Sequence, residues 1–273
     1  MPDQHRLAGT TYGVQVTRPL RAPDESAIRR LVIGTTAAAV LLIGCSAAGA
    51  RADEQPSPEP VAEVAPVQEP TSAPAFPLRI GDQGPAVASA QRRLIWLGAH
   101  IDRQELAGER FGRTTRSAVH AFQEKFLGSR NGQLGRVTWN RLRQIAGRVD
   151  VLPAACDRHK ALCIDMSQRV LRYVVDGQAV LILDARFGMP GNATARGTFR
   201  VRSKSRNHVS TLYRTSMPYA MFFHGDQAVH YSPYFARDGY DGGSHGCVNL
   251  RDRKAAAWLF DHVPIGTTVY VAD

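Results

Sequence analysis

Residues 244–249 read SHGCVN, which places Cys247 in a glycine-containing stretch two residues after His245. A cysteine becomes a nucleophile when a base takes its proton or a cation stabilises the thiolate. Neighbouring residues on a turn do not readily face each other, so we expect the base to come from elsewhere in the chain. His230 ends a predicted strand and is separated from Cys247 by 16 residues, a loop long enough to bring the two side chains together. We therefore expect an activated thiol that alkylating reagents modify faster than an ordinary one.

The predicted role of His230 is to take the thiol proton and later to act as general base for an acceptor amine. A catalytic histidine usually needs an acceptor that orients its second ring nitrogen. No carboxylate is placed for this in the sequence, so we expect a backbone carbonyl near Tyr231 or Ser232 to do it.

An acyl intermediate on Cys247 also needs donors for the oxyanion. The stretch His245-Gly246-Cys247 offers consecutive backbone N–H groups, and Gly246 permits a turn that points them inward. Ser244 and Asn249 add polar side chains on either side. Together these residues predict acyl transfer through a thioester.

The region that must position these residues, 156–273, is expected to be a mainly-β domain resembling a β-sandwich. Val, Leu and Ile recur with a period of two across 160–188, and Asp176-Gly177 is a typical hairpin turn between two strands. Further strands are expected within 197–205, 220–232 and 266–273. The one clear helix lies within 251–263.

The order His230, then Ser244 to Asn249, resembles the signature of the L,D-transpeptidases with a YkuD-type catalytic domain. GTFRV, beginning at Gly197, and MPYAMFF, beginning at Met217, are similar to strands of that family, and the likeness covers roughly residues 160–272. The resemblance implies that Cys247 attacks the third residue of a peptidoglycan tetrapeptide stem and expels the terminal D-alanine.

By the same resemblance, the acyl group then passes to the side-chain amine of a second stem, which cross-links two stems. Water as acceptor would make the protein a carboxypeptidase instead. The resemblance also implies acylation of Cys247 by carbapenem-type β-lactams and requires no cofactor. The residues expected to contact the donor stem are Ser244, Tyr219, Tyr231 and Asn249.

Three other interpretations compete with this one. A zinc site could draw on His224, His230, His245 and Cys247, but the chain has neither HExxH nor CxxC, so we predict no metal site. His224 and His208 are expected to be structural or rim residues. Papain-like enzymes place cysteine before histidine, whereas here His230 comes first. The third rival is a catalytically silent wall-binding protein with a vestigial thiol.

Residues 78–148 show helical periodicity in three short stretches joined by glycine turns. Val87, Ala90, Leu94 and Leu97 form one apolar face, and a second helix is expected to begin at Thr114 or Thr115 as N-cap. We expect a small all-α three-helix bundle.

The order of residues in this segment resembles the peptidoglycan-binding domain of bacterial wall enzymes. The glycines and Phe111, Phe122, Gln123, Thr138 and Trp139 fall where that family places them. The segment holds 13 Arg or Lys against 5 Asp or Glu, a balance that suits an anionic wall polymer and equally a solvated basic face. The alternative is a helical spacer without a ligand.

The first 50 residues are expected to hold an export signal. Arg29 and Arg30 precede an apolar run from Leu31 to Gly44 that is short for a membrane span. LIGC, ending at Cys45, looks like a lipobox, which would make Cys45 a lipidation site; cleavage near Ala48 or Ala50 and a retained anchor are the alternatives. Residues 51–77 are rich in proline and predict an extended linker.

Export would permit disulfides. Cys156 and Cys163 are separated by a spacing that suits a short disulfide-closed loop, and two reduced cysteines are the alternative. This pairing leaves Cys247 as the unpaired thiol.

The composition favours a globular protein with an anionic partner. Hydrophobic residues make up 44% and charged residues 21% of the 273-residue chain, and the net charge is +10. This charge favours nucleic acid, anionic lipid or an anionic wall polymer and does not choose between them. The basic residues are scattered and no nucleic-acid-binding motif occurs, and the family resemblances imply peptidoglycan as the partner. The expected location is the cell envelope, either at the outer face of the cytoplasmic membrane or in the wall. No pattern in the sequence predicts an oligomeric state.

Overall fold

The structure, a computed structural model, describes residues 75–128, 130–157 and 159–273. The predicted export signal, the lipidation site at Cys45 and the linker up to residue 74 lie outside the described residues. Among the residues that are described, no helix has the length and apolar character needed to cross a membrane.

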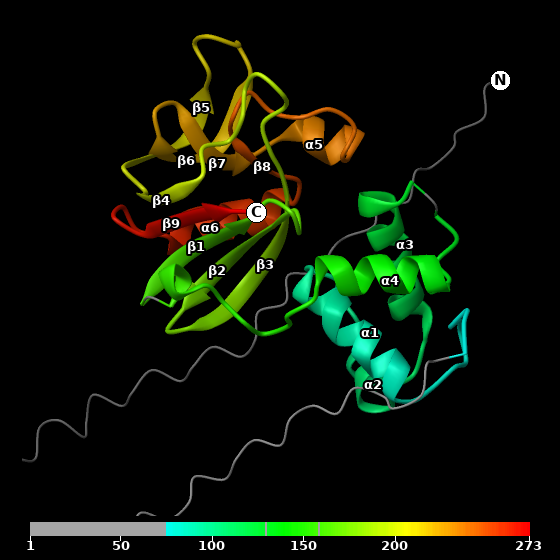
Figure 1. The fold of residues 1–273 in the computed structure, drawn as a ribbon. Coiled ribbons are helices and arrows are strands. Elements are labelled where there is room, and N and C mark those ends of the chain that lie inside the picture. The colour runs from blue at the N-terminus through cyan, green and yellow to red at the C-terminus, as the bar shows by residue number, and fades with distance from the viewer. Residues whose placement is uncertain (1–74, 129, 158) are drawn as a thin grey trace, which may run out of the picture. The chain divides into compact units, whose positions relative to one another are not determined.

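Residues 85–145 form the predicted helical bundle (Figure 1). Its three main helices are α1 (Pro85–Trp96), α3 (Arg113–Phe126) and α4 (Arg136–Ile145). A fourth, short helix, α2 (Arg103–Ala107), was not among the three expected helices, and the Asp102 side chain caps it by accepting from the Gln104 N–H. The apolar faces meet in one core that includes Val87, Leu94, Phe111, Phe122, Leu134, Trp139 and Leu142.

The predicted N-cap of α3 at Thr114 or Thr115 is wrong. The helix begins two to three residues earlier, with Gly112 as N-cap and no capping side chain of its own. The Glu105 carboxylate of α2 satisfies these amides instead, accepting from Thr114 N–H and Thr115 N–H at 2.9 Å each and from Gly112 N–H at 3.2 Å. A carboxylate at a helix N-terminus is stabilised by the unpaired amides and the helix dipole.

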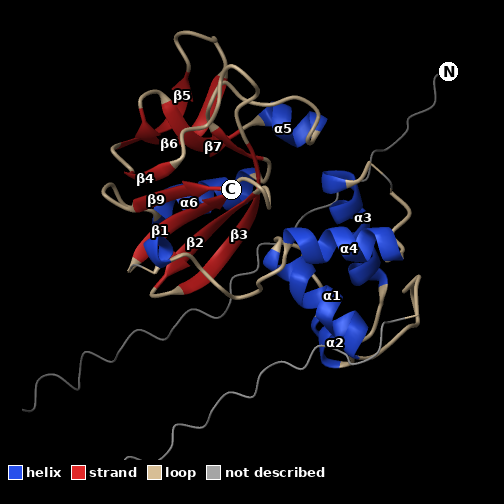
Figure 2. Ribbon diagram, in the orientation of Figure 1, coloured by secondary structure: helices blue, strands red, loops and turns tan. Residues whose placement is uncertain are grey.

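The predicted mainly-β domain follows, and Figure 2 shows its strands in red. The strands form one nine-stranded sheet in the order β4-β9-β1-β2-β3-β8-β7-β6-β5. Their bounds are β1 Lys160–Asp165, β2 Val170–Val175, β3 Gln178–Arg186, β4 Gly197–Arg200, β5 Ser203–Val209, β6 Ser216–His224, β7 Gln227–Tyr231, β8 Val248–Leu250 and β9 Thr268–Ala272.

The sheet curls around helix α6 (Arg253–His262), so its two halves enclose one core as the faces of a sandwich would (Figure 1). Strands from both halves bury side chains there together with α6; the members include Leu162, Leu171, Met221, Val229, Leu250, Leu259 and Val269. The predicted hairpin turn is confirmed: Asp176 and Gly177 join β2 to β3, with φ of 49° and 74°. Two successive positive φ values are typical of a type I′ turn, whose twist matches that of the strands.

Two features flank this sheet. The structure pairs Cys156 with Cys163 in a disulfide that joins a short 3₁₀ helix (Ala154–Cys156) to β1, with the Cα atoms 5.8 Å apart. Helix α5 (Pro233–Asp238) was missed by the sequence analysis, although Ser232 followed by Pro233 is a typical N-cap and first helical residue. Helix α5 occupies part of the connection from β7 to β8.

Candidate active site

Strands β7 and β8 bring the predicted cysteine and histidine to one face of the sheet. They pair in parallel, with Val229 opposite Val248 and His230 opposite Asn249. Because the two are paired, His230 and Asn249 share a face. Cys247 lies two residues before Asn249 and packs against Ala228, two residues before His230, so it lies on the same face. The loop containing α5 therefore returns the chain from the end of β7 to the start of β8, as the spacing of His230 and Cys247 predicted.

The thiol of Cys247 packs in a small apolar cluster formed by Met217, Ala220 and Ala228, with Phe222 beside them. Its Sγ donates to the carbonyl oxygen of Asp226 at 3.9 Å. Burial raises the pKa of the Cys247 thiol above its ordinary value, although a hydrogen bond from the Ala228 amide opposes this. The resting thiol is therefore protonated at neutral pH.

His230 is buried, with 6% of its surface exposed. Its Nδ1 lies 2.7 Å from the carbonyl oxygen of Tyr231, which is the backbone acceptor that the sequence predicted. Burial lowers the pKa of His230 to about 4. The imidazole is therefore neutral at neutral pH, and the Tyr231 carbonyl requires the proton on Nδ1, which leaves Nε2 as the basic nitrogen.

The turn before Cys247 is held by Ser244. Its Oγ donates to the Cys247 carbonyl at 2.6 Å and accepts from the Gly246 N–H at 3.2 Å. Gly246 has a φ of 107°, a conformation that L residues rarely adopt. Within the part of the chain that the structure describes, the amides of His245 and Cys247 donate no hydrogen bond. These two N–H groups, rather than that of Gly246, are therefore free to meet an oxyanion.

Asn249 lies buried across the ladder from His230. Among the described residues, its Oδ1 has no hydrogen-bond partner. A buried carbonyl oxygen without a donor carries a desolvation cost of about 1–3 kcal/mol. Its neighbour His230 becomes a better donor once protonated, and the interaction with Asn249 raises the pKa of His230, against the larger lowering by burial.

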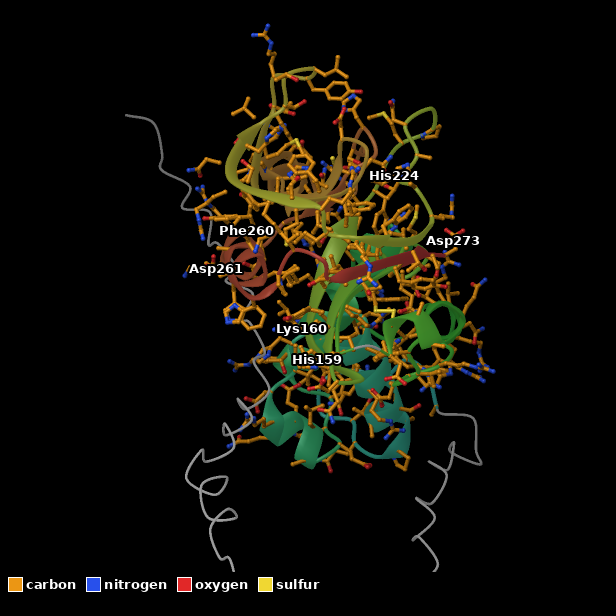
Figure 3. All side chains as sticks on the ribbon, turned by 90° about the vertical axis from the view of Figure 1, so that its left-hand side faces the viewer. His159, Lys160, His224, Phe260, Asp261 and Asp273 are labelled. Carbon is orange, nitrogen blue, oxygen red and sulfur yellow. A yellow bond between two sulfur atoms is a disulfide. The ribbon has the colours of Figure 1, made fainter. Side chains whose placement is uncertain are left out.

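The two predicted tyrosine side chains pack against the core around α6, whereas the thiol packs in the cluster of Met217, Ala220 and Ala228. Tyr219 has a φ of 60° and packs against the core around α6, with its ring centroid 6.0 Å from that of Phe260. Figure 3 labels Phe260 and its neighbour Asp261 on α6. The Tyr231 side chain packs against the same core, with Arg253 5.7 Å from its ring. Contacts of Tyr219 and Tyr231 with a substrate stay a prediction.

One aromatic residue near the site was missed. Tyr213 lies in the connection between β5 and β6 and stacks on the exposed His245, with ring centroids 3.9 Å apart. It is itself 41% exposed. A single aromatic in a polar hairpin connection gives no sequence signal of its own, because the pairing across to residue 245 depends on the tertiary fold.

The two histidines that were expected to be structural or rim residues contact phenylalanine rings. His224, labelled in Figure 3, is exposed and lies 4.9 Å from the ring of Phe199. His208 packs edge-on against Phe222 at 5.0 Å. Over residues 75–128, 130–157 and 159–273, no group of three or more His, Cys, Asp or Glu side chains is arranged to hold a metal ion.

Comparison with known families identifies both parts of the chain. The model of the L,D-transpeptidase catalytic domain, YkuD, matches residues 159–271, which contain the whole site. The catalytic domain belongs to the L,D-transpeptidase family. The model of a peptidoglycan-binding domain matches residues 83–142, within the helical bundle.

Individual relatives of this L,D-transpeptidase domain are distant. L,D-transpeptidase 1 of Mycobacterium tuberculosis is 30% identical over 110 residues, a match that covers 35% of this chain and 43% of the relative. The chain therefore spans less than half the length of the curated relative that it matches.

Two solved structures are also similar. The L,D-transpeptidase of Xylanimonas cellulosilytica (residues 123–326) is 32% identical, with a TM-score of 0.47, covering 74% of this chain and 100% of that one. The L,D-transpeptidase of Stackebrandtia nassauensis is 26% identical, with a TM-score of 0.47, covering 73% of this chain and 98% of that one.

Proposed function

We propose that this protein is a cysteine-dependent L,D-transpeptidase that cross-links peptidoglycan stem peptides. The observation that carries the proposal is the shared face of β7 and β8, where His230 lies opposite Asn249, two residues after Cys247. On this face the thiol is protonated and the imidazole is neutral. A neutral pair of this kind suits general-base catalysis, in which the proton leaves as the nucleophile attacks.

In the acylation step, the Sγ of Cys247 forms a bond to the carbonyl carbon of the third stem residue. The thiol proton passes to Nε2 of His230, and the peptide C–N bond breaks. The proton then goes to the departing amine, so that D-alanine leaves and a thioester remains. Burial disfavours the protonated His230, so the proton is readily returned. The unpaired Oδ1 of Asn249 is the group that can accept a hydrogen bond from the transient imidazolium.

The oxyanion of the tetrahedral intermediate is held by the N–H groups of His245 and Cys247. Gly246 supplies the turn that separates these two amides, and Ser244 fixes the turn from within. Removing one oxyanion donor typically costs about 10²–10³ in rate. Ser244 was expected to contact the donor stem. We propose that it acts through its two hydrogen bonds, which fix the shape of this turn.

In the second step, the side-chain amine of an acceptor stem attacks the thioester, and neutral His230 takes its proton. The sulfur leaves, takes the proton back and restores Cys247, while an amide joins the two stems. Water in place of the amine gives the carboxypeptidase reaction. We further propose that the helical bundle binds the same polymer, that export brings the chain to the cell envelope, and that Cys45 anchors it there.

The test is to incubate the purified chain with disaccharide-tetrapeptide and to follow the products by mass. A dimer lacking one D-alanine, absent with Cys247→Ala, supports the transpeptidase. Tripeptide without dimer favours the carboxypeptidase. Binding to intact sacculi without any turnover by either protein favours the silent wall-binding protein and refutes the proposal.

A further inference from the structure

Gln227, the first residue of β7, makes two hydrogen bonds to a loop that is distant in sequence. Its Oε1 accepts from the Ala195 N–H at 2.9 Å, and its Nε2 donates to the Ala193 carbonyl at 3.0 Å. The carboxamide thus pairs with the loop backbone as a neighbouring strand would. Because both of its polar atoms are engaged, the side chain is fixed in one orientation.

The same side chain covers the turn that precedes the nucleophile. A Cβ added to Gly246 would lie 2.6 Å from the Nε2 and 3.1 Å from the Cδ of Gln227. The carboxamide therefore lies directly against the Gly246 Cα. Glycine at this φ has a wide choice of conformations, and the contact with Gln227 limits that choice.

The backbone on either side of Gln227 holds the sulfur. The preceding residue, Asp226, accepts from the Cys247 Sγ, and the amide of the following residue, Ala228, donates to it. These backbone groups belong to the β6–β7 turn and to β7, so they do not depend on the chemistry of the Gln227 side chain.

Gln227 hydrogen-bonds to the loop of residues 187–195. The same loop also hydrogen-bonds to Ser244, at the start of the turn Ser244–Cys247. The Ser244 N–H donates to the Phe187 carbonyl at 2.8 Å, and the Met189 N–H donates to the Ser244 carbonyl at 3.0 Å. Inside the loop, the Gly188 N–H donates to Thr194 Oγ1 at 3.0 Å. The loop is thus fastened to the turn directly at Ser244 and through Gln227 at Gly246.

We propose that Gln227 is a positioning residue for acylation, clamping the 187–195 loop against the turn Ser244–Cys247 so that the oxyanion N–H groups are held in place. This rests on the acyl transfer proposed above. Gln227 thus holds the N–H groups that bind the oxyanion. It takes no part in deprotonating the Cys247 thiol, which His230 does.

Two reactions of the same thiol separate these functions. Alkylation by iodoacetamide displaces iodide at an sp³ carbon and forms no oxyanion. Acylation by p-nitrophenyl acetate forms a C–S bond through a tetrahedral oxyanion and then expels p-nitrophenolate, and it requires no peptidoglycan. If the turn Ser244–Cys247 no longer holds its N–H groups in place, only the acylation by the ester becomes slower.

The experiment compares the full chain with Gln227→Leu, which keeps the bulk over Gly246 and removes both hydrogen bonds. The matched control is Gln178→Leu, at an exposed glutamine that likewise begins a strand after a tight turn. We expect Gln227→Leu to slow acylation by the ester about tenfold or more. Alkylation should change by less than about twofold, and the control should leave both rates unchanged.

Gln227→Glu adds a pH readout that a merely structural role would not give. The introduced carboxyl can still accept from Ala195, and it donates to the Ala193 carbonyl only when protonated. Ester acylation relative to the full unmodified chain should therefore fall as pH rises through the ordinary range of a carboxyl group, about 4–5. This variant also keeps the test readable if Gln227→Leu does not fold.

Unchanged acylation in folded Gln227→Leu, or a flat pH ratio for Gln227→Glu, overturns the inference. An equal loss of acylation and alkylation also overturns it, because that would show an effect on the thiol itself. If the unmodified chain is acylated by the ester but never releases D-alanine from tetrapeptide, the proposed function fails while the comparison of Gln227 variants still stands.

Discussion

The residues that carry the family resemblance have different roles in the helical bundle and in the catalytic domain. In the helical bundle, Phe111, Phe122 and Trp139 are buried in the core, and Gln123 binds Thr138 Oγ1 and the Gly132 N–H. All of these residues hold the fold. In the catalytic domain, the corresponding family residues are Cys247 and His230, whose protonation equilibria are shifted by burial. A motif match in the bundle thus predicts a structure, whereas a match in the catalytic domain predicts chemistry.

Two buried polar groups show the contrast most clearly. Burial alone would raise the pKa of Glu105 in the bundle, but its hydrogen bonds from Thr114 and Thr115 outweigh this and lower the pKa. Its charge is fully compensated. In the active site, Asn249 Oδ1 has no partner among the described residues, and His230 is held neutral. Uncompensated groups of this kind gather at functional sites.

The largest expected effect is at the nucleophile. Replacing Cys247 by Ala should reduce D-alanine release at least about a thousandfold, because no other group can form the thioester. The melting temperature should change little, since the hydrogen bonds of the thiol to the Asp226 carbonyl and from the Ala228 amide are weak sulfur contacts. Mass analysis and a thermal melt of the same preparation check both points. Residual turnover at more than a few per cent would contradict the assignment of Cys247.

The reverse pattern is expected for Glu105→Gln in the bundle. The introduced NH₂ would face the amides at the start of α3, so we expect a loss of about 2–3 kcal/mol in the free energy of unfolding. Acylation by p-nitrophenyl acetate should be unchanged. The measurements are denaturant unfolding and hydrogen exchange of the α3 amides.

The control for this change is Glu124→Gln, which removes a surface carboxylate 3.6 Å from Arg130. A pair of this kind contributes about 0–1 kcal/mol. If Glu105→Gln slowed acylation while leaving the stability of the bundle intact, the division of roles between the two regions would be wrong.

The pH dependence follows from His230. Its pKa is lowered by burial from an ordinary 6.5 to about 4, so the base stays neutral across the weakly acidic range. The acid limb of the acylation rate should therefore lie near pH 4. The unfolded chain takes up this proton first as pH falls, so the contribution of His230 to stability is present above about pH 6.5 and is lost between there and about pH 4. An acid limb near pH 6.5 would contradict the buried, neutral base.

The smallest expected effect concerns the resting thiol, and here the structure reverses an expectation from sequence. Because burial raises the pKa of Cys247, iodoacetamide should modify it more slowly than a free cysteine at neutral pH. The rate should keep rising to beyond pH 9. Rapid alkylation that levels off below pH 7 would instead indicate a preformed thiolate–imidazolium pair.

Much of this architecture could be predicted from sequence because its signals are local. Alternation along the strands, the Asp176-Gly177 turn and the three apolar helix faces each depend on a few neighbouring residues. The pairing of Cys247 with His230 could be predicted, because the loop between them is long enough for one strand to return beside the other.

What could not be predicted depends on contacts between distant segments. Glu105 caps a helix other than its own, Tyr213 stacks on His245, and Gln227 grips residues 193 and 195. The raised pKa of Cys247 was missed for the same reason, since burial is a property of the assembled sheet. The short helix α5 is different, because its Ser-Pro start was visible in the sequence and was overlooked.

The position of β9 constrains how the enzyme can be made. This strand, Thr268–Ala272, lies between β4 and β1 and pairs in parallel with β1, which is more than a hundred residues earlier in the chain. Contacts of such long range form late. During synthesis, the sheet cannot close until β9 has emerged. A nascent chain therefore carries Cys247 in a domain whose sheet stays open until β9 is added.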